Sequence, residues 1–249
     1  MSFDGTGRAG GGVRVGFVAA LNIECASLRR QAAHAGGWQV TQSGPGATRA
    51  AAAATRVVDS GAQVLVSWGL AGGLDAALVP GSVVAPRYVV PQGDAPLAVD
   101  AGWHARLASL GDEFDFHYGD LLTVPAALES PAAKRAAATA AHAVAVDMES
   151  AAIARVAARA RVPFLALRVI VDALDDALPS GAEQWIDERG NRRVAAALRA
   201  VMAPSQWPPL VTLARRYRVA SGVLDGLARA LARRGVLAQQ EPVPLRAGS

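Results

Sequence analysis

Three acidic residues, Glu24, Glu149 and Asp172, have the positions expected of residues that do chemistry. Glu149 and Asp172 each follow an apolar run that predicts a buried strand, and Glu24 lies in the opening turn of a predicted helix. Ligands of open α/β sheets collect beyond the carboxyl ends of the strands, so we predict that these acids share a site. We expect the apolar surroundings of Asp172 to raise its pKa, which would let it donate a proton at neutral pH.

Each acid also has a purely structural interpretation. Asp172 could cap a turn and pair with Arg168, which is the polar residue of the preceding apolar run. Glu149 and Glu24 could each complement the dipole of the helix that they open. The sequence leaves both interpretations open for each acid.

Two glycine-rich turns beside the predicted strand ends could let a ligand approach the backbone: Gly44-Pro45-Gly46 and Gly69-Leu70-Ala71-Gly72-Gly73. The first follows a strand and opens a helix, as in a dinucleotide-binding fingerprint. However, Arg49 occupies the third glycine position, and Pro45 lacks the backbone donor that would face a pyrophosphate. We therefore expect no nicotinamide or flavin site. Ordinary tight turns remain the alternative for both segments.

The elements that must position these residues repeat the order strand, small-residue turn, helix. Strands are predicted at 13–21, 38–41, 63–68, 81–90, 119–124, 144–146 and 163–171. Helices are predicted at 23–35, 48–60, 131–142, 151–161, 193–202, 210–220 and 223–233, and 92–118 is expected to be irregular. Residues 144–172 form a predicted β-α-β unit, and the whole pattern indicates an α/β fold with a mainly parallel, twisted sheet.

Composition excludes several classes of function. The net charge of +4 comes almost entirely from arginines, which are scattered among acids except near the C-terminus, so we expect no nucleic acid as a partner. The single cysteine, Cys25, excludes an internal disulfide and fits a reducing compartment. The four histidines are far apart in the sequence, so we predict no metal site. No apolar run is long enough to span a membrane.

The chain is expected to hold one main domain. Residues 1–12 are rich in glycine and predict a disordered lead-in, 13–203 predict the catalytic domain, and 204–249 predict a helical extension rich in arginine and leucine. A basic helix of this kind could meet an anionic membrane surface, or it could pack on the core or on a second subunit.

An ordered set of motifs resembles the nucleoside phosphorylase and nucleosidase superfamily, especially its methylthioadenosine/S-adenosylhomocysteine nucleosidase branch. The motifs are GFVAAL leading to Glu24, SGPG at 43–46, GLAGGL at 69–74, VDMES at 146–150, and 162–172 with Arg168 and Asp172. The resemblance implies a three-layer α/β/α sandwich around a mixed, mostly parallel twisted sheet, with a small C-terminal helical extension.

The resemblance also implies roles for the acids. Asp172 would protonate the departing purine at N7, because an anionic adenine is a poor leaving group. Glu149 would accept hydrogen bonds from the ribose hydroxyls, with Met148 packed against the sugar, and Glu24 would orient the attacking water. The segment from Leu122 to Leu128 would contact the base.

The residues that hold phosphate in the phosphorylase branch are not evident here. Ser67 and Leu70 occupy the places around the glycine turn where that branch has an arginine and a serine. Water is therefore the acceptor that is easier to defend, although Arg168 or Arg87 could hold a phosphate. We expect no cofactor, with inorganic phosphate left open as a co-substrate.

A narrower likeness to the hopanoid-associated phosphorylase subgroup lies in the DMES core, the DALDDALP segment at 172–179 and the Leu/Arg-rich tail. It implies adenosylhopane as the substrate, a cytoplasmic protein that can touch the inner membrane surface, and a homodimer. Two alternatives stay open. One is a methylthioadenosine/S-adenosylhomocysteine nucleosidase, and the other is a nucleoside-binding protein without catalytic activity.

Overall fold

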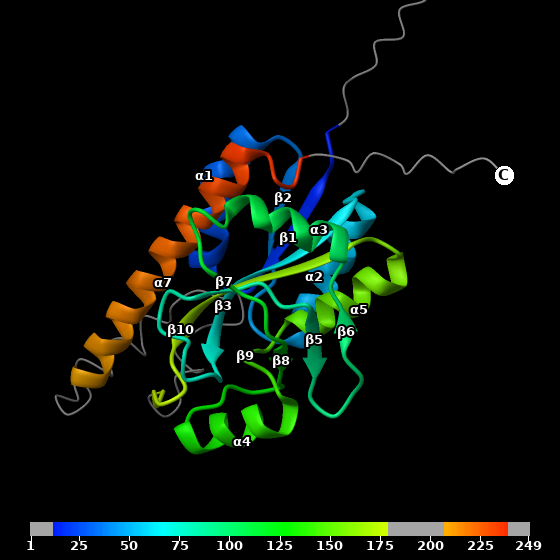
Figure 1. Ribbon diagram of the computed structural model, residues 1–249. Helices are drawn as coiled ribbons and strands as arrows, with labels where there is room; N and C mark the ends of the chain where they lie inside the picture. Colours follow the sequence, from blue (N-terminus) through cyan, green and yellow to red (C-terminus); the bar gives the residue numbers. More distant parts are fainter. Residues whose placement is uncertain (1–11, 179–206, 239–249) are drawn as a thin grey trace, which may run out of the picture.

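The computed structural model describes residues 12–178 and 207–238. A central, mostly parallel sheet is flanked by helices (Figure 1), which confirms the predicted fold class. The strands are β1 Val15–Ala19, β2 Trp38–Gln42, β3 Val64–Gly73, β4 Val83–Val84, β5 Tyr88–Pro91, β6 Leu97–Ala98, β7 Phe116–His117, β8 Leu121–Thr123, β9 Ala145–Asp147 and β10 Phe164–Asp172. The helices are α1 Asn22–Ala35, α2 Ala47–Asp59, α3 Ala101–Ala105, the 3-10 helix η1 Arg106–Leu110, α4 Pro131–Ala141, α5 Ser150–Ala160 and α7 Trp207–Arg234.

Strand β3 organises the sheet, because three strands pair with it. Residues 65–72 of β3 pair on one edge with the parallel strand β10. On its other edge, β1 pairs in parallel with residues 64–67, and β9 pairs antiparallel with Gly72 and Gly73. β1 and β9 therefore run toward each other along the same edge of β3. Their carboxyl ends face a gap beside residues 68–71, where the edge of β3 has no strand partner.

The sheet curls strongly, as the positions of β4 and β5 show. Its neighbouring strands follow the order β6-β5-β8-β9-β3-β10-β4-β7. β4 and β5 lie near opposite ends of this order, yet only residues 85–87 join them. Such a short segment spans at most about 14 Å, so the two ends of the sheet must approach each other. The predicted continuous strand 81–90 is wrong, because the structure divides it into β4 and β5. Pro86 lies between them, and proline lacks the amide that a central strand needs.

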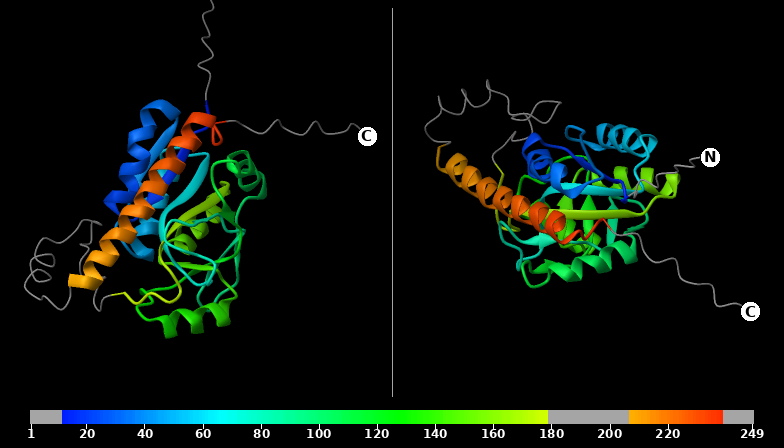
Figure 2. Two further views of the ribbon diagram at one scale, coloured as in Figure 1. Left: turned by 60° about the vertical axis from the view of Figure 1, so that its left-hand side comes forward. Right: turned by 90° about the horizontal axis from the view of Figure 1, so that it is seen from above.

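Two pairs of helices pack on the sheet, α3 also contacts β10, and α4 lies apart from both pairs. α2 packs against α5 and β1, while α7 lies along α1 and contacts β10 (Figure 2). The leucines and alanines of α7 at 224, 227, 228, 230 and 231 are buried against the core. α4 lies at the lower end of the molecule in Figure 1, away from α1, α2 and α3. None of the helices in the described ranges is long and apolar enough to cross a membrane.

Several predicted elements need correction. Gly69 to Gly73 do not form a turn, because β10 pairs with this stretch and makes it the second half of β3. The segment 92–118 is not irregular throughout, since it contains β6, α3, η1 and β7. The two predicted tail helices are one helix, α7, which continues through Gly222. The predicted lead-in up to residue 11 and the predicted helix 193–202 lie outside the described residues.

The predicted β-α-β unit is confirmed in its order but not in its geometry. β9, α5 and β10 follow one another, but β3 lies between the two strands, and β9 runs antiparallel to β3 whereas β10 runs parallel to it. The carboxyl ends of β9 and β10 therefore point in opposite directions. Glu149, which follows β9, and Asp172, which ends β10, are thus carried by strands that run in opposite directions.

Candidate active site

A small pocket fills the gap between the facing ends of β1 and β9. Its volume, counted as the room open to the centre of a water molecule, is about 10 Å³, which is enough for about one water. Residues from five segments line it: Val18, Ala20, Glu24, Ser43, Trp68, Gly69, Leu70, Glu149, Ile153 and Arg168. The pocket thus brings Glu24 and Glu149 together, as the sequence predicts for two of the three acids.

Glu24 stands against the open edge of β3 and replaces a strand partner there. Its Oε1 accepts a hydrogen bond of 2.8 Å from the amide of Leu70. Its Oε2 accepts one of 2.8 Å from the amide of Leu21, which precedes α1. Burial raises the pKa of Glu24, and the two amides oppose this rise. Glu24 therefore serves the helix end, as the structural interpretation predicts, and also faces the pocket.

Gly69 makes room for this carboxylate. A Cβ at this position would lie 2.5 Å from Oε1 of Glu24 and 2.8 Å from its Cδ, much closer than van der Waals contact permits. Any other residue would push Glu24 away from β3. The glycine thus serves the close approach of an acid to the strand, rather than a turn of the chain.

Glu149 reaches the pocket from the opposite side. Its Oε1 accepts a hydrogen bond of 2.7 Å from the amide of Gly46, in the glycine turn that opens α2. Gly44 and Gly46 have φ angles of 78° and 99°, which favour glycine. Burial, together with the charges of Asp147 and Glu24, raises the pKa of Glu149 to about 7, and the Gly46 amide opposes this rise. Glu149 is therefore poised to change its charge near neutral pH.

Arg168 lies in the wall of the pocket, but its guanidinium is already committed. It forms an ion pair of 2.7 Å with Asp147, and both side chains are buried. The same Nη2 donates to the hydroxyls of Ser67 at 2.6 Å and Ser150 at 2.8 Å. Asp147 also accepts a hydrogen bond of 2.7 Å from Thr123. The predicted pairing of Arg168 with Asp172 is therefore wrong, because Asp147 is its partner.

Asp172 lies outside the lining of this pocket. Its register partner on β3 is Gly72, three residues along from Gly69, and a bulge in β10 directly precedes it. Its Oδ2 forms a buried ion pair with Lys134 of α4. Burial raises the pKa of Asp172, in the direction that the sequence predicts, and the Lys134 ammonium opposes the rise.

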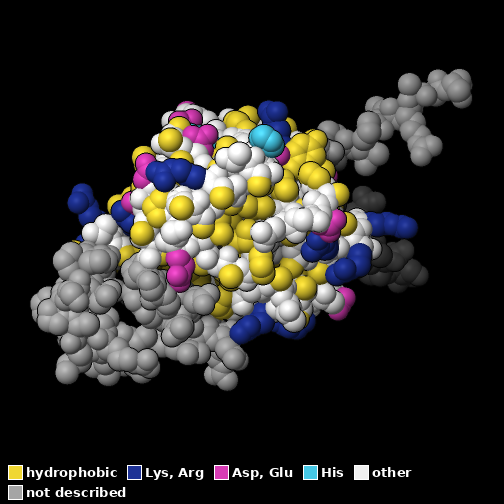
Figure 3. All heavy atoms as spheres, turned by 90° about the horizontal axis from the view of Figure 1, so that it is seen from below, with side chains coloured by type: hydrophobic (Ala, Val, Ile, Leu, Met, Phe, Trp, Pro, Cys, Tyr) yellow, Lys and Arg dark blue, Asp and Glu magenta, His cyan; other side chains and the backbone are white. Residues whose placement is uncertain are grey.

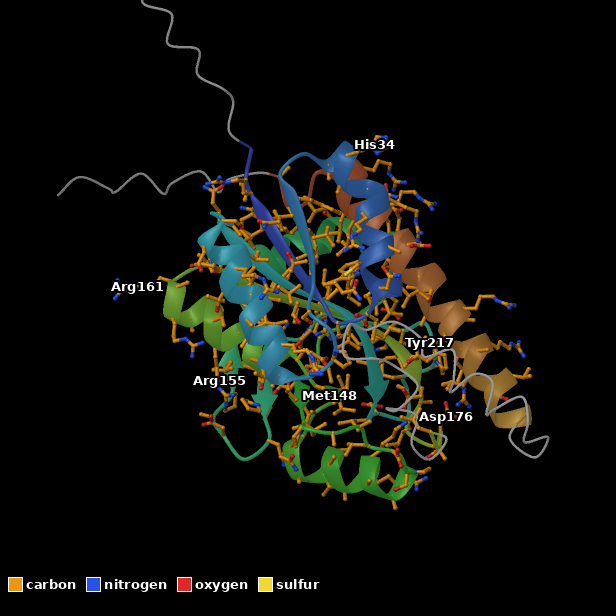
Figure 4. The ribbon with its side chains drawn as sticks, turned by 180° about the vertical axis from the view of Figure 1, so that it is seen from behind. His34, Met148, Arg155, Arg161, Asp176 and Tyr217 are labelled. Atoms are coloured by element: carbon orange, nitrogen blue, oxygen red, sulfur yellow. The ribbon has the colours of Figure 1, made fainter. Side chains whose placement is uncertain are left out.

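The residues predicted to contact the sugar and the base gather beneath α4. Leu122 and Leu128 belong with Met148 to a small apolar cluster whose buried members also include Leu74 and Val146. Met148 is half-buried and lies close to α4 in Figure 4. The face of the molecule on which α4 lies carries hydrophobic side chains across its middle and charged ones toward its rim (Figure 3). Arg87, by contrast, is exposed between β4 and β5 and is not part of the pocket lining.

The sequence did not reveal the roles of Lys134 and Asp147. Lys134 is the only lysine of the chain, in a helix made mostly of alanine, and this isolation was the available signal. Asp147 ends the apolar strand two residues before Glu149, and its buried carboxylate contacts Arg168 and Thr123. Because both residues have partners far away in the sequence, only the fold identifies them.

The comparisons with solved structures agree with this fold. The 5′-methylthioadenosine/S-adenosylhomocysteine nucleosidase from Neisseria meningitidis has a similar structure, with a TM-score of 0.67 and 17% identity over 88% of this chain and 98% of that one. A variant of the Helicobacter pylori nucleosidase, with 5′-methylthioadenosine in its active site, gives 0.65 and 16% over 89% and 100%. The futalosine hydrolase of Helicobacter pylori gives 0.65 and 16% over 88% and 98%.

At these identities the structural matches establish the fold alone. A search of curated protein sequences finds no match. The family comparison is more specific, because residues 22–203 match the model described as the phosphorylase superfamily. This range includes every acid discussed above, and it supports the expected enzyme class, a nucleosidase or a phosphorylase. The chain belongs to the phosphorylase superfamily.

Proposed function

We propose that the chain cleaves the N-glycosidic bond of an adenosine with a hydrophobic 5′ substituent and releases adenine, with water as the acceptor. The proposed substrate is adenosylhopane, as the sequence resemblance implies, and the proposed role is in hopanoid biosynthesis. The observation that carries the reaction is the pocket in which Glu24 and Glu149 meet, with room for about one water between two strand ends.

The proposed roles divide the acids between the two ends of the substrate. Glu149 accepts hydrogen bonds from the ribose hydroxyls, Met148 packs on the sugar, and Glu24 orients the water. Asp172 donates its proton to N7 of adenine as the glycosidic bond breaks. Three residues of strand span about 10 Å, so a nucleoside lying along β3 between Gly69 and Gly72 could meet both groups.

Water is favoured over phosphate by the charges around the pocket. Arg168 is the one cation among the lining residues, and its charge is offset by Asp147. A phosphate dianion would also meet the carboxylates of Glu24 and Glu149, which would repel it. Arg87 stands outside this lining. An enzyme that uses phosphate would need a free cation at this place.

The test is an adenine-release assay on adenosylhopane, methylthioadenosine and S-adenosylhomocysteine, each with and without phosphate. We expect release from adenosylhopane at a rate that phosphate does not change, with kcat/KM at least 100-fold above that for either thioether. Efficient turnover of the thioethers alone would establish the alternative, a methylthioadenosine/S-adenosylhomocysteine nucleosidase. Purine binding without release from any substrate would point to a non-enzymatic binding protein.

Membrane contact is proposed for the exposed face of α7. Val211, Arg215, Arg218 and Val219 are exposed and share this face, a pattern that suits an anionic lipid surface. Other arginines of α7 pair with acids of the protein, as Arg216 does with Asp176. The double change R215E/R218E should abolish sedimentation with vesicles of phosphatidylglycerol, and unchanged sedimentation would reject the contact. The expected homodimer is tested by sedimentation equilibrium.

A further inference from the structure

The surroundings of Lys134 are those of a lysine with a specific task. Its side chain is 1% exposed and forms an ion pair with Asp172, which is 4% exposed. Its Nζ also donates to the carbonyl oxygens of Ala173 at 2.7 Å and Asp176 at 3.0 Å. Three acceptors match the three hydrogens of an ammonium group. The lysine therefore makes its full set of hydrogen bonds inside the protein.

The segment after β10 is fastened to α4 by further contacts. The amide of Leu178 donates to the carbonyl of Glu129 at 2.9 Å, just before the start of α4. Asp176 forms an ion pair of 2.5 Å with Arg216 of α7, and its other carboxylate oxygen accepts a hydrogen bond from the amide of Ala173. Figure 4 shows Asp176 beside α7. Lys134 thus sits at the junction of α4, the end of β10 and, through Asp176, α7.

We propose that Lys134 is a positioning residue that acts through Asp172, fixing the carboxyl group and stabilising the carboxylate that remains once the proton has gone to the departing base. This inference rests on the proposed function, in which Asp172 is the acid. The same helix carries Lys134 and follows the segment 122–128 predicted to contact the base. Lys134 therefore links the position of Asp172 to the helix that follows the base-contacting segment.

The proton balance of the step is simple. The O–H bond of protonated Asp172 breaks, its proton joins N7, and the electron pair of the glycosidic bond moves to N9, so that adenine leaves neutral. The carboxylate stays beside the Lys134 ammonium, which keeps its three protons. Water adds to C1′ and loses one proton, and solvent returns one proton to Asp172. A nearby positive charge favours the carboxylate, so it makes Asp172 a stronger acid.

The consequence is a change in pH dependence, which a merely structural lysine would not produce. In Lys134→Met the positive charge is lost, and the pKa of Asp172 should rise. The acid then stays protonated to higher pH, so the alkaline limb of kcat should move up by about one pH unit or more. A weaker acid also transfers its proton less readily. The maximal kcat should fall about tenfold or more, with KM changed less than about threefold.

The experiment measures adenine release from adenosylhopane between pH 5 and 10 for the wild-type protein and for Lys134→Met, Lys134→Gln and Lys134→Arg. Lys134→Gln keeps hydrogen bonding without charge, and serves if the methionine variant fails to fold. Lys134→Arg keeps a positive charge, so the alkaline limb of kcat should stay close to its wild-type pH. Arg135→Met is the matched control, because it removes the neighbouring exposed cation that pairs with Asp175, and its profile should not move.

A wild-type protein that releases adenine, together with an unmoved alkaline limb in both uncharged variants, would overturn this inference and leave the proposed function intact. A wild-type protein that releases no adenine would overturn the proposed function and the inference with it. An independent readout is the carboxyl signal of Asp172 in aspartate-labelled protein, assigned with Asp172→Asn. Its midpoint should rise in Lys134→Met, and an unchanged midpoint would count against the proposal.

Discussion

The two acidic regions of the molecule hold their carboxylates in different ways. In the pocket region, defined by Glu24 and Glu149, backbone amides of Leu21, Leu70 and Gly46 hold the acids, and the nearby Arg168 is occupied by Asp147. In the clamp region, defined by Lys134 and Asp172, a buried ammonium faces the acid directly. Backbone amides and an ammonium both favour the charged carboxylate, but only the ammonium places a full positive charge beside it. Acids of nearly identical chemistry can therefore serve different steps.

The largest expected effect comes from removing one acid in each region. Asp172→Asn and Glu149→Gln should each lower kcat/KM for adenine release at least about 1,000-fold, which is about 4 kcal/mol of transition-state stabilisation. Circular dichroism should show both variants folded. Near-normal release in either one would remove that region from the catalytic account.

The next effect compares the stability of the two kinds of ion pair on α4. Lys134→Met leaves a buried acid without its partner and should lower the free energy of unfolding by about 3 kcal/mol. Arg135→Met breaks an exposed pair with Asp175, and should cost less than about 0.5 kcal/mol. Urea unfolding of both variants at pH 7 gives the comparison. Equal losses of unfolding free energy in the two variants would contradict a larger contribution from the buried ion pair of Lys134 and Asp172.

The fit of the pocket is tested through a glycine. Gly69→Ala would press on the carboxylate of Glu24 and displace it from the amides that hold it, so we expect adenine release to fall about 100-fold. Gly222→Ala is the control, since a Cβ there meets nothing within 4 Å and alanine suits a helix better by about 1 kcal/mol. An active Gly69→Ala enzyme would show that Glu24 is not held as described.

The smallest effect is a pH dependence of stability that belongs to the pocket. The pKa of Glu149 is raised from 4.5 to about 7, so between these values the folded protein keeps a proton that the unfolded chain loses. Stability is then lost as the pH rises through this window. Glu149→Gln lacks this loss, so its stability relative to the wild type should increase by about 2 kcal/mol from pH 5 to pH 7. A constant difference across the window would contradict the raised pKa.

The sequence predicted the elements better than their pairing. Strand and helix positions followed from apolar runs and glycine turns, and the meeting of Glu24 and Glu149 followed from their places after strands. The direction of β9 could not be predicted, because three apolar residues carry no signal for parallel or antiparallel pairing. For the same reason the sequence did not show that Glu149 and Asp172 follow strands of opposite direction. The partners of Lys134 lie 38 or more residues away in the sequence. Local sequence patterns therefore could not predict them.

The central claim is that the pocket delivers water to the sugar while the clamp delivers a proton to the base. Its most direct test is cleavage of adenosylhopane in ¹⁸O-labelled water that contains phosphate, with the sugar product analysed by mass spectrometry. The account predicts one ¹⁸O atom at C1′ of a free ribosyl product, and no sugar phosphate. A ribosyl 1-phosphate without label at C1′ would contradict it.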